Sequence, residues 1–123
     1  VRLTRELASA LEYAHGRGVV HRDVKPENVL LQDGRALLAD FGIARASADL
    51  RTTHTLTRTG MAIGTPAYMS PEQATADREV DARTDQYSLA CVLYEMLTGQ
   101  APFMARTTQA VIARHLVDPV PSI

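Results

Sequence analysis

Apolar residues recur at steps of four and three residues at the start of the chain. Leu3, Leu7, Leu11 and Ala14 follow this spacing, with charged residues between them. The spacing places the four side chains on one face of a helix. Gly16, the first glycine, supplies a stop signal. We therefore predict an amphipathic helix that ends near Gly16.

Three further helices are predicted in the second half of the chain. The Ser-Pro-Glu string at 70–72 supplies a cap, a proline at the first helical position and an acid in the first turn. A longer helix is expected over 81–97, followed by Gly99, and another over 111–116, followed by Pro119. The apolar positions of the longer helix are Leu89, Val92, Leu93, Met96 and Leu97.

The region between the first helix and residue 40 shows a shorter pattern. Residues 19–20 are a short extended candidate, and the polar stretch 21–28 follows no period. Apolar runs at 29–31 and 36–39 flank the Asp-Gly pair at 33–34, which favours a tight hairpin turn. We therefore predict a functional loop followed by a small β-hairpin. The threonine-rich stretch 45–65 is predicted to be a long exposed segment.

Composition narrows the classes of protein that remain. Of the 123 residues, 46% are hydrophobic and 22% charged, which is typical of one globular domain. A formal net charge of -1 offers no overall field for nucleic acid or an anionic membrane. The single cysteine, Cys91, excludes an internal disulfide, and we expect a buried, inert thiol. The opening on Val1 within a predicted helix suggests a piece of a longer polypeptide.

The polar stretch 21–28 holds side chains that phosphoryl transfer requires. That reaction needs a carboxylate for the attacking hydroxyl, oxygen ligands for magnesium and a cation for the transferring group. The stretch reads His-Arg-Asp-Val-Lys-Pro-Glu-Asn, and a second carboxylate, Asp40, follows the predicted hairpin. One carboxylate and one amide carbonyl suffice as protein ligands, because Mg²⁺ retains several waters. A lone His-Arg-Asp string is more often a solvated loop, so the order of the strings carries the signal.

The strings His-Arg-Asp, Asn, Asp-Phe-Gly, Gly-Thr-Pro and Ser-Pro-Glu occur in an order typical of protein kinases. The chain resembles the eukaryotic-type serine/threonine protein kinases, and its Ser-Pro-Glu-Gln string looks bacterial. The likeness extends from Val1 to about Val120. It implies an α+β, mainly α-helical fold, in which residues 1–123 form part of the C-terminal lobe. A small β-hairpin would lie next to the catalytic loop, with a long activation segment, and the N-terminal lobe and final helices would be missing.

The resemblance implies roles for the polar residues. Asp23 would accept or orient the substrate hydroxyl, and Lys25 would place its ammonium on the γ-phosphate of ATP. Asn28 and Asp40 would hold Mg²⁺. Leu30 would lie under the adenine ring, although a core position also suits a hairpin leucine.

The resemblance also implies how the protein would be regulated. Arg22 could pair with a phosphate on the activation segment. Thr57 and Thr59 lie eight and six residues before Thr65, where resembling bacterial kinases carry phosphorylated threonines. The alternative is a merely polar loop. Thr65 itself would hydrogen-bond the catalytic aspartate and lysine.

Several matched positions are expected to be structural. His21 and Phe41 would stack, and Asp85 would anchor them through hydrogen bonds to the catalytic-loop backbone. Gly42 completes the Asp-Phe-Gly string. Glu72 pairs in this family with an arginine beyond Ile123, so we expect a buried carboxylate without its partner and a fragile chain.

No glycine-rich phosphate loop or strand lysine matches within these residues. We therefore expect the isolated chain to bind ATP poorly and to transfer little phosphate. The implied partners are ATP and a protein with serine or threonine hydroxyls, with no nucleic acid and no membrane contact. A second copy of the kinase would serve autophosphorylation. The implied location is cytoplasmic, with a membrane anchor allowed elsewhere in the parent protein.

Two other functions stay open. One is a non-catalytic kinase-like module that binds proteins, which the intact set of Asp23, Asn28 and Asp40 disfavours. The other is a small-molecule phosphotransferase of kinase-like fold, which the segment ending in Ser-Pro-Glu disfavours.

Overall fold

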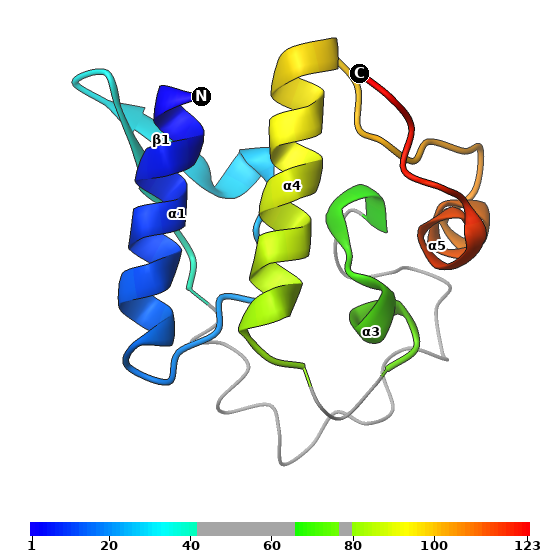
Figure 1. Ribbon diagram of the computed structural model, residues 1–123, viewed down its shortest axis with the longest axis horizontal. Helices are drawn as coiled ribbons and strands as arrows, with labels where there is room; N and C mark the ends of the chain where they lie inside the picture. The colour runs from blue at the N-terminus through cyan, green and yellow to red at the C-terminus, as the bar shows by residue number, and fades with distance from the viewer. Residues whose placement is uncertain (42–65, 77–79) are drawn as a thin grey trace.

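The computed structural model describes residues 1–41, 66–76 and 80–123. Helices α1 and α4 lie side by side, with α3 and α5 beyond α4 (Figure 1). The described part of the chain is mainly helical, with one small antiparallel sheet. Its elements are α1 (Arg2–His15), η1 (Pro26–Asn28), β1 (Val29–Gln32), β2 (Arg35–Leu38), η2 (Pro66–Tyr68), α3 (Pro71–Ala74), α4 (Ala82–Thr98) and α5 (Thr108–Val117).

Helix α1 confirms the apolar pattern at the start of the chain. Leu7, Leu11 and Ala14 are buried, and the helix ends at the residue before Gly16. Two of its polar side chains bond to the hairpin, in contacts that the hydrophobic pattern did not indicate. Arg2 Nη2 donates to Gly34 O at 2.7 Å, and Glu6 Oε2 accepts from Ala36 N at 2.7 Å. Helix α1 therefore holds the hairpin through backbone groups.

The predicted hairpin is confirmed. Strands β1 and β2 pair antiparallel, with Leu30 opposite Leu37. Asp33 and Gly34 have φ of 51° and 75°, as a type I′ turn requires at both central residues. Residues 19–20, the short extended candidate, belong to no strand. They lie in the connection that leads from α1 to the polar loop.

Helix α4 begins and ends where its local signals predicted. Asp81 caps it by accepting from Arg83 N, and Gly99 ends it with φ of 85°. Its buried face, however, is largely polar and comprises Thr84, Asp85, Ser88, Cys91 and Val92. Met96 and Leu97, expected on the apolar face, are 46% and 52% exposed. At 17 residues α4 is the longest described helix, and no described helix is both long and apolar enough to cross a membrane.

The core lies between α1, α4 and the loops that connect them. Its buried members are Leu11, Val24, Ala67, Tyr68, Cys91, Val92 and Ala101. Cys91 is 4% exposed, and burial raises the pKa of its thiol to about 12. The expectation of a buried thiol is therefore confirmed, and the raised pKa agrees with an inert one. Val24, within the polar loop, is 1% exposed and ties that loop to the core.

Helix α5 packs through a buried histidine. The Tyr87 hydroxyl lies 2.7 Å from His115 Nδ1, and the Phe103 ring meets the imidazole edge-on at 4.8 Å. Burial lowers the pKa of His115, while the backbone carbonyls of Pro66 and Ala67 partly oppose that shift. The packing of α5 against η2 and α4 therefore favours a neutral imidazole.

We predict that His115 makes the stability of the chain depend on pH. Below the ordinary histidine pKa of about 6.5, the unfolded chain takes up a proton at this side chain before the folded chain does. The free energy of unfolding should therefore fall as the pH drops from about 7.5 to 5.5, by at most about 1.4 kcal/mol per pH unit. Urea midpoints of the wild type and His115→Phe, followed by far-ultraviolet circular dichroism, measure the difference. A difference between the two proteins that stays constant with pH would contradict the prediction.

Candidate active site

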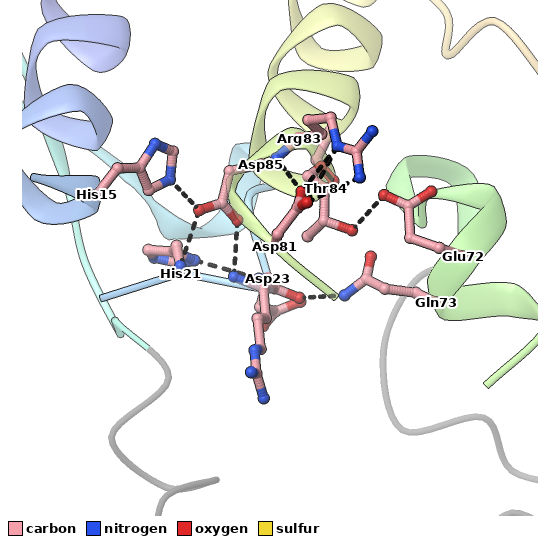
Figure 2. Close-up of polar contacts among 11 residues, drawn as sticks. His15, His21, Asp23, Glu72, Gln73, Asp81, Arg83, Thr84 and Asp85 are labelled. Carbon is pink, nitrogen blue, oxygen red and sulfur yellow. Dashed lines mark hydrogen bonds and ion pairs between the residues drawn. The ribbon is translucent and has the colours of Figure 1, made fainter. Parts of the chain in front are cut away.

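A buried carboxylate, that of Asp85 in α4, anchors the start of the polar loop. Asp85 is 0% exposed and accepts from His21 N at 2.8 Å and Arg22 N at 2.7 Å. His15 Nε2, at the end of α1, lies 2.7 Å from Asp85 Oδ2. Figure 2 shows His15 and His21 converging on Asp85. The hydrogen bonds expected between Asp85 and the loop backbone are therefore present.

Asp85 stabilises an unfavourable backbone conformation at Arg22. Arg22 has φ of 66°, a left-handed conformation that costs a residue with a side chain about 1 to 3 kcal/mol. Hydrogen bonds from its own N–H and that of His21 to an ionised carboxylate are worth about 1.5 to 3 kcal/mol each. They offset the cost, so the turn at Arg22 persists. The chain leaves this turn with the Asp23 side chain 51% exposed.

Asp23 lies at the centre of a small polar cluster. Asn28 Nδ2 donates to Asp23 O at 2.8 Å and to Asp23 Oδ2 at 3.1 Å. Lys25 Nζ lies 3.0 Å from the same Oδ2. The Lys25 side chain is only 18% exposed, and Asn28 is 6% exposed. The cluster therefore presents a half-exposed carboxylate, one oxygen of which is held by an amide and an ammonium group.

The His21 ring links the loop to the residues after the hairpin. Its Nε2 lies 2.8 Å from Ala39 O, which can only accept, and its Nδ1 accepts from Asp23 N at 3.2 Å. These partners require the neutral tautomer with the proton on Nε2. The ring also contacts Phe41 edge-on, with centroids 4.6 Å apart. The expected contact between His21 and Phe41 is therefore present.

The backbone of the hairpin brings Ala39, the residue before Asp40, next to Asn28. Ala39 N donates to Asn28 O at 2.8 Å, and Asp40 is the next residue along the chain. Asp40 is exposed and has φ of 56°. Both bonds from Asn28 to Asp23 use Nδ2, which directs the amide carbonyl away from Asp23. An amide oxygen and an exposed carboxylate form a donor set that suits Mg²⁺. The described residues contain no cluster of three or more His, Cys, Asp or Glu side chains that could hold a metal ion.

The expectation for Glu72 needs correction. Its side chain is half-buried and accepts a hydrogen bond from Thr84 Oγ1 at 2.9 Å. It is therefore not a buried carboxylate without any partner. Thr84 in turn lies 2.5 Å from Ser70 Oγ, the cap of α3. This chain of hydroxyls joins the start of α3 to the buried face of α4.

Other predicted residues have different outcomes. Leu30 is 52% exposed, so the alternative that it belongs to the core is wrong. Gly42, Thr57, Thr59 and Thr65 lie outside the described residues.

No role was predicted from the sequence for two residues that contact this region, His15 and Gln73. His15 reads as the last residue of an amphipathic helix, and Gln73 as part of a helix start. Their bonds reach Asp85 and Arg22, which are 70 and 51 residues away. No local pattern carries a signal for partners at that separation.

Comparison with known proteins decides the family. Residues 1–120 match the family described as protein kinase domain. The chain belongs to the protein kinase family. The position of the candidate site, between a loop that carries His-Arg-Asp and a hairpin that leads to Asp-Phe, agrees with the kinase signatures.

The chain is similar to several mycobacterial kinases. The chain is 52% identical over 122 residues to serine/threonine-protein kinase PknD of Mycobacterium tuberculosis. It is 47% identical over 123 residues to PknB of Mycolicibacterium smegmatis and 48% identical over 122 residues to PknH of Mycobacterium bovis. Each match covers 98% of this chain and 18 to 20% of the relative. The chain therefore spans about a fifth of the length of these kinases.

We predict that Asp85→Asn destabilises the chain. An amide has one acceptor oxygen, and in either orientation its NH₂ group would face the backbone N–H of His21 or of Arg22, leaving a buried donor unsatisfied. The expected loss is about 1 to 3 kcal/mol of unfolding free energy. Urea midpoints measure it, with Asp33→Asn at the exposed turn as the matched control. Equal midpoints for the two variants would show that Asp85 does not anchor the loop.

Proposed function

We propose that the full-length protein transfers the γ-phosphoryl group of ATP to serine or threonine hydroxyls of proteins. One geometric observation carries the proposal, namely that Lys25 and Asn28 both contact Oδ2 of the half-exposed Asp23. Membership of the protein kinase family supports it, as do relatives named serine/threonine-protein kinases. We also propose that residues 1–123 form part of the C-terminal lobe of the kinase domain.

Asp23 is assigned to the substrate hydroxyl. Because its two side-chain contacts use Oδ2, Oδ1 is the oxygen that we assign to orient the hydroxyl and accept its proton. The side-chain nitrogen of Asn28 donates to the Asp23 carboxylate and also to the backbone carbonyl of Asp23. An acid held in this way loses little freedom when the substrate arrives, which lowers the entropic part of the barrier.

Lys25 is assigned to the transferring phosphoryl group. Its ammonium lies 3.0 Å from the Asp23 carboxylate, so it can stand between that carboxylate and an incoming phosphate. A cation there would balance the charge of the phosphate oxygens against the charge of Asp23. Without it, the carboxylate and the phosphate would repel each other.

Asn28 and Asp40 are assigned to magnesium, and Leu30 to the adenine ring of ATP. Mg²⁺, when bound, would neutralise charge on the phosphates. The side-chain carbonyl of Asn28 and the exposed carboxylate of Asp40 provide the oxygens. Leu30 offers exposed apolar surface on β1, the strand that follows Asn28.

Regulation by phosphorylation is a further part of the proposal. The left-handed turn at Arg22 lies beside Asp23, so a phosphate bound by its guanidinium would act next to the catalytic carboxylate. Thr57 and Thr59 are the proposed phosphorylated residues, and Thr65 the proposed partner of Asp23 and Lys25. We further propose a cytoplasmic location for the kinase domain. Nothing in the described part of the chain or in the comparisons supports the expected homodimer, and we do not propose one.

We predict that Asp23→Asn lowers kcat of the full-length protein about 1000-fold, because the amide cannot accept the hydroxyl proton. Transfer of labelled γ-phosphate from Mg-ATP to protein and to small hydroxyl compounds measures it. Asp33→Asn, at the exposed hairpin turn, is the control and should retain wild-type activity.

The same assay separates the rival functions. Wild-type protein that turns over no Mg-ATP would support a non-catalytic module. Transfer to small hydroxyl compounds alone would support a small-molecule phosphotransferase. Loss of protein phosphorylation on chelation of magnesium should accompany the proposed function.

We also predict that joint replacement of Thr57 and Thr59 by alanine lowers both the phosphate content and the activity of the full-length protein. The reason is that Arg22 would then have no phosphate to bind. Mass spectrometry of the intact protein and the transfer assay measure the two effects. Unchanged activity together with unchanged phosphate content would refute this assignment.

A further inference from the structure

Gln73 connects α3 directly to the catalytic loop. Its Nε2 donates to the backbone carbonyl of Arg22 at 2.8 Å, across 51 residues of sequence. Figure 2 shows the Gln73 side chain reaching from α3 toward the loop that carries Asp23. Gln73 is half-buried, which shields this bond from competition with water.

The other end of the same amide is used within α3. Gln73 Oε1 accepts from Ser70 N at 3.1 Å, and Ser70 Oγ accepts from Gln73 N at 3.3 Å, which completes a capping box. The orientation of the amide follows from its partners, because the Arg22 carbonyl can only accept and Ser70 N can only donate. A glutamate would serve the capping box equally well. Only the bond to Arg22 requires glutamine.

Arg22 is therefore held on both sides of its strained backbone. Asp85 of α4 accepts from its N–H at 2.7 Å, and Gln73 of α3 donates to its carbonyl. The residue between them has φ of 66° and sets the direction in which Asp23 leaves the turn. A shift of α3 relative to α4 would thus act on the orientation of the Asp23 carboxylate.

We propose that Gln73 is a positioning residue, which couples the position of α3 to the catalytic loop through the Arg22 carbonyl. This inference rests on the proposed kinase function. Helix α3 follows η2 directly, at the end of the segment that contains the proposed phosphorylated threonines. A change in that segment would then act on α3 through the polypeptide chain. The hydrogen bond from Gln73 to Arg22 would pass the change on to Asp23.

Gln73→Glu in the full-length protein tests the coupling. The substitution keeps the capping box and the shape of the side chain, and it replaces the donor to Arg22 by an acceptor. We expect kcat for protein phosphorylation to fall about tenfold, with KM for ATP unchanged. Hydrogen exchange, followed by mass spectrometry, should rise in residues 21–25 and stay unchanged in residues 70–76.

Two further variants complete the test. Gln73→Met removes the donor without adding charge, and it should lower kcat to a similar extent. Gln86→Glu places the same change on an exposed position of α4 and should behave like the wild type. Wild-type kcat and exchange in Gln73→Glu would overturn the inference. So would a rise of exchange in residues 70–76 without one in residues 21–25, since Gln73 would then serve α3 alone.

Failure of the proposed function gives a different result. A wild-type protein that phosphorylates no protein would remove that function and, with it, the catalytic consequence of Gln73. Hydrogen exchange of residues 21–25 in the wild type and in Gln73→Glu would still decide whether Gln73 holds the loop.

Discussion

The structure of the site depends on one buried charge. Asp85 is completely shielded from water, a position that costs a carboxylate several kcal/mol unless hydrogen bonds replace its hydration. Two backbone N–H groups of the polar loop and the His15 ring supply those bonds. The dependence is mutual, because the loop has almost no regular structure of its own and satisfies its backbone through Asp85.

This arrangement explains why the central helix has a polar buried face. Asp85 bonds to the polar loop, Thr84 to the start of α3 and Ser88 to the carbonyl of Tyr68. Helix α4 therefore organises the irregular segments around it by hydrogen bonds, while Cys91 and Val92 join the apolar core. Rigid support from α4 combined with an exposed Asp23 suits a site that must be preformed and still open to substrate.

Elements with local signals could be predicted from the sequence. The Asp33–Gly34 turn, the start of α3 at Ser70 and the end of α4 at Gly99 each depend on the conformational preferences of neighbouring residues. Burial was predicted less well. Met96 and Leu97 are apolar and exposed. The face of a helix that is buried depends on which segments pack against it, and the periodicity of the helix does not specify those segments.

The sequence by itself determined the family, because the order and spacing of a few polar strings are typical of protein kinases. The same strings predict roles for its aspartates, lysine and asparagine. The tertiary structure alone decided how those residues are held. His15, Gln73 and Asp85 act through hydrogen bonds between residues that are 51 to 70 positions apart in the sequence. Such bonds depend on distance and direction to within fractions of an ångström, and only the packing of α1, α3 and α4 around the loop sets those quantities.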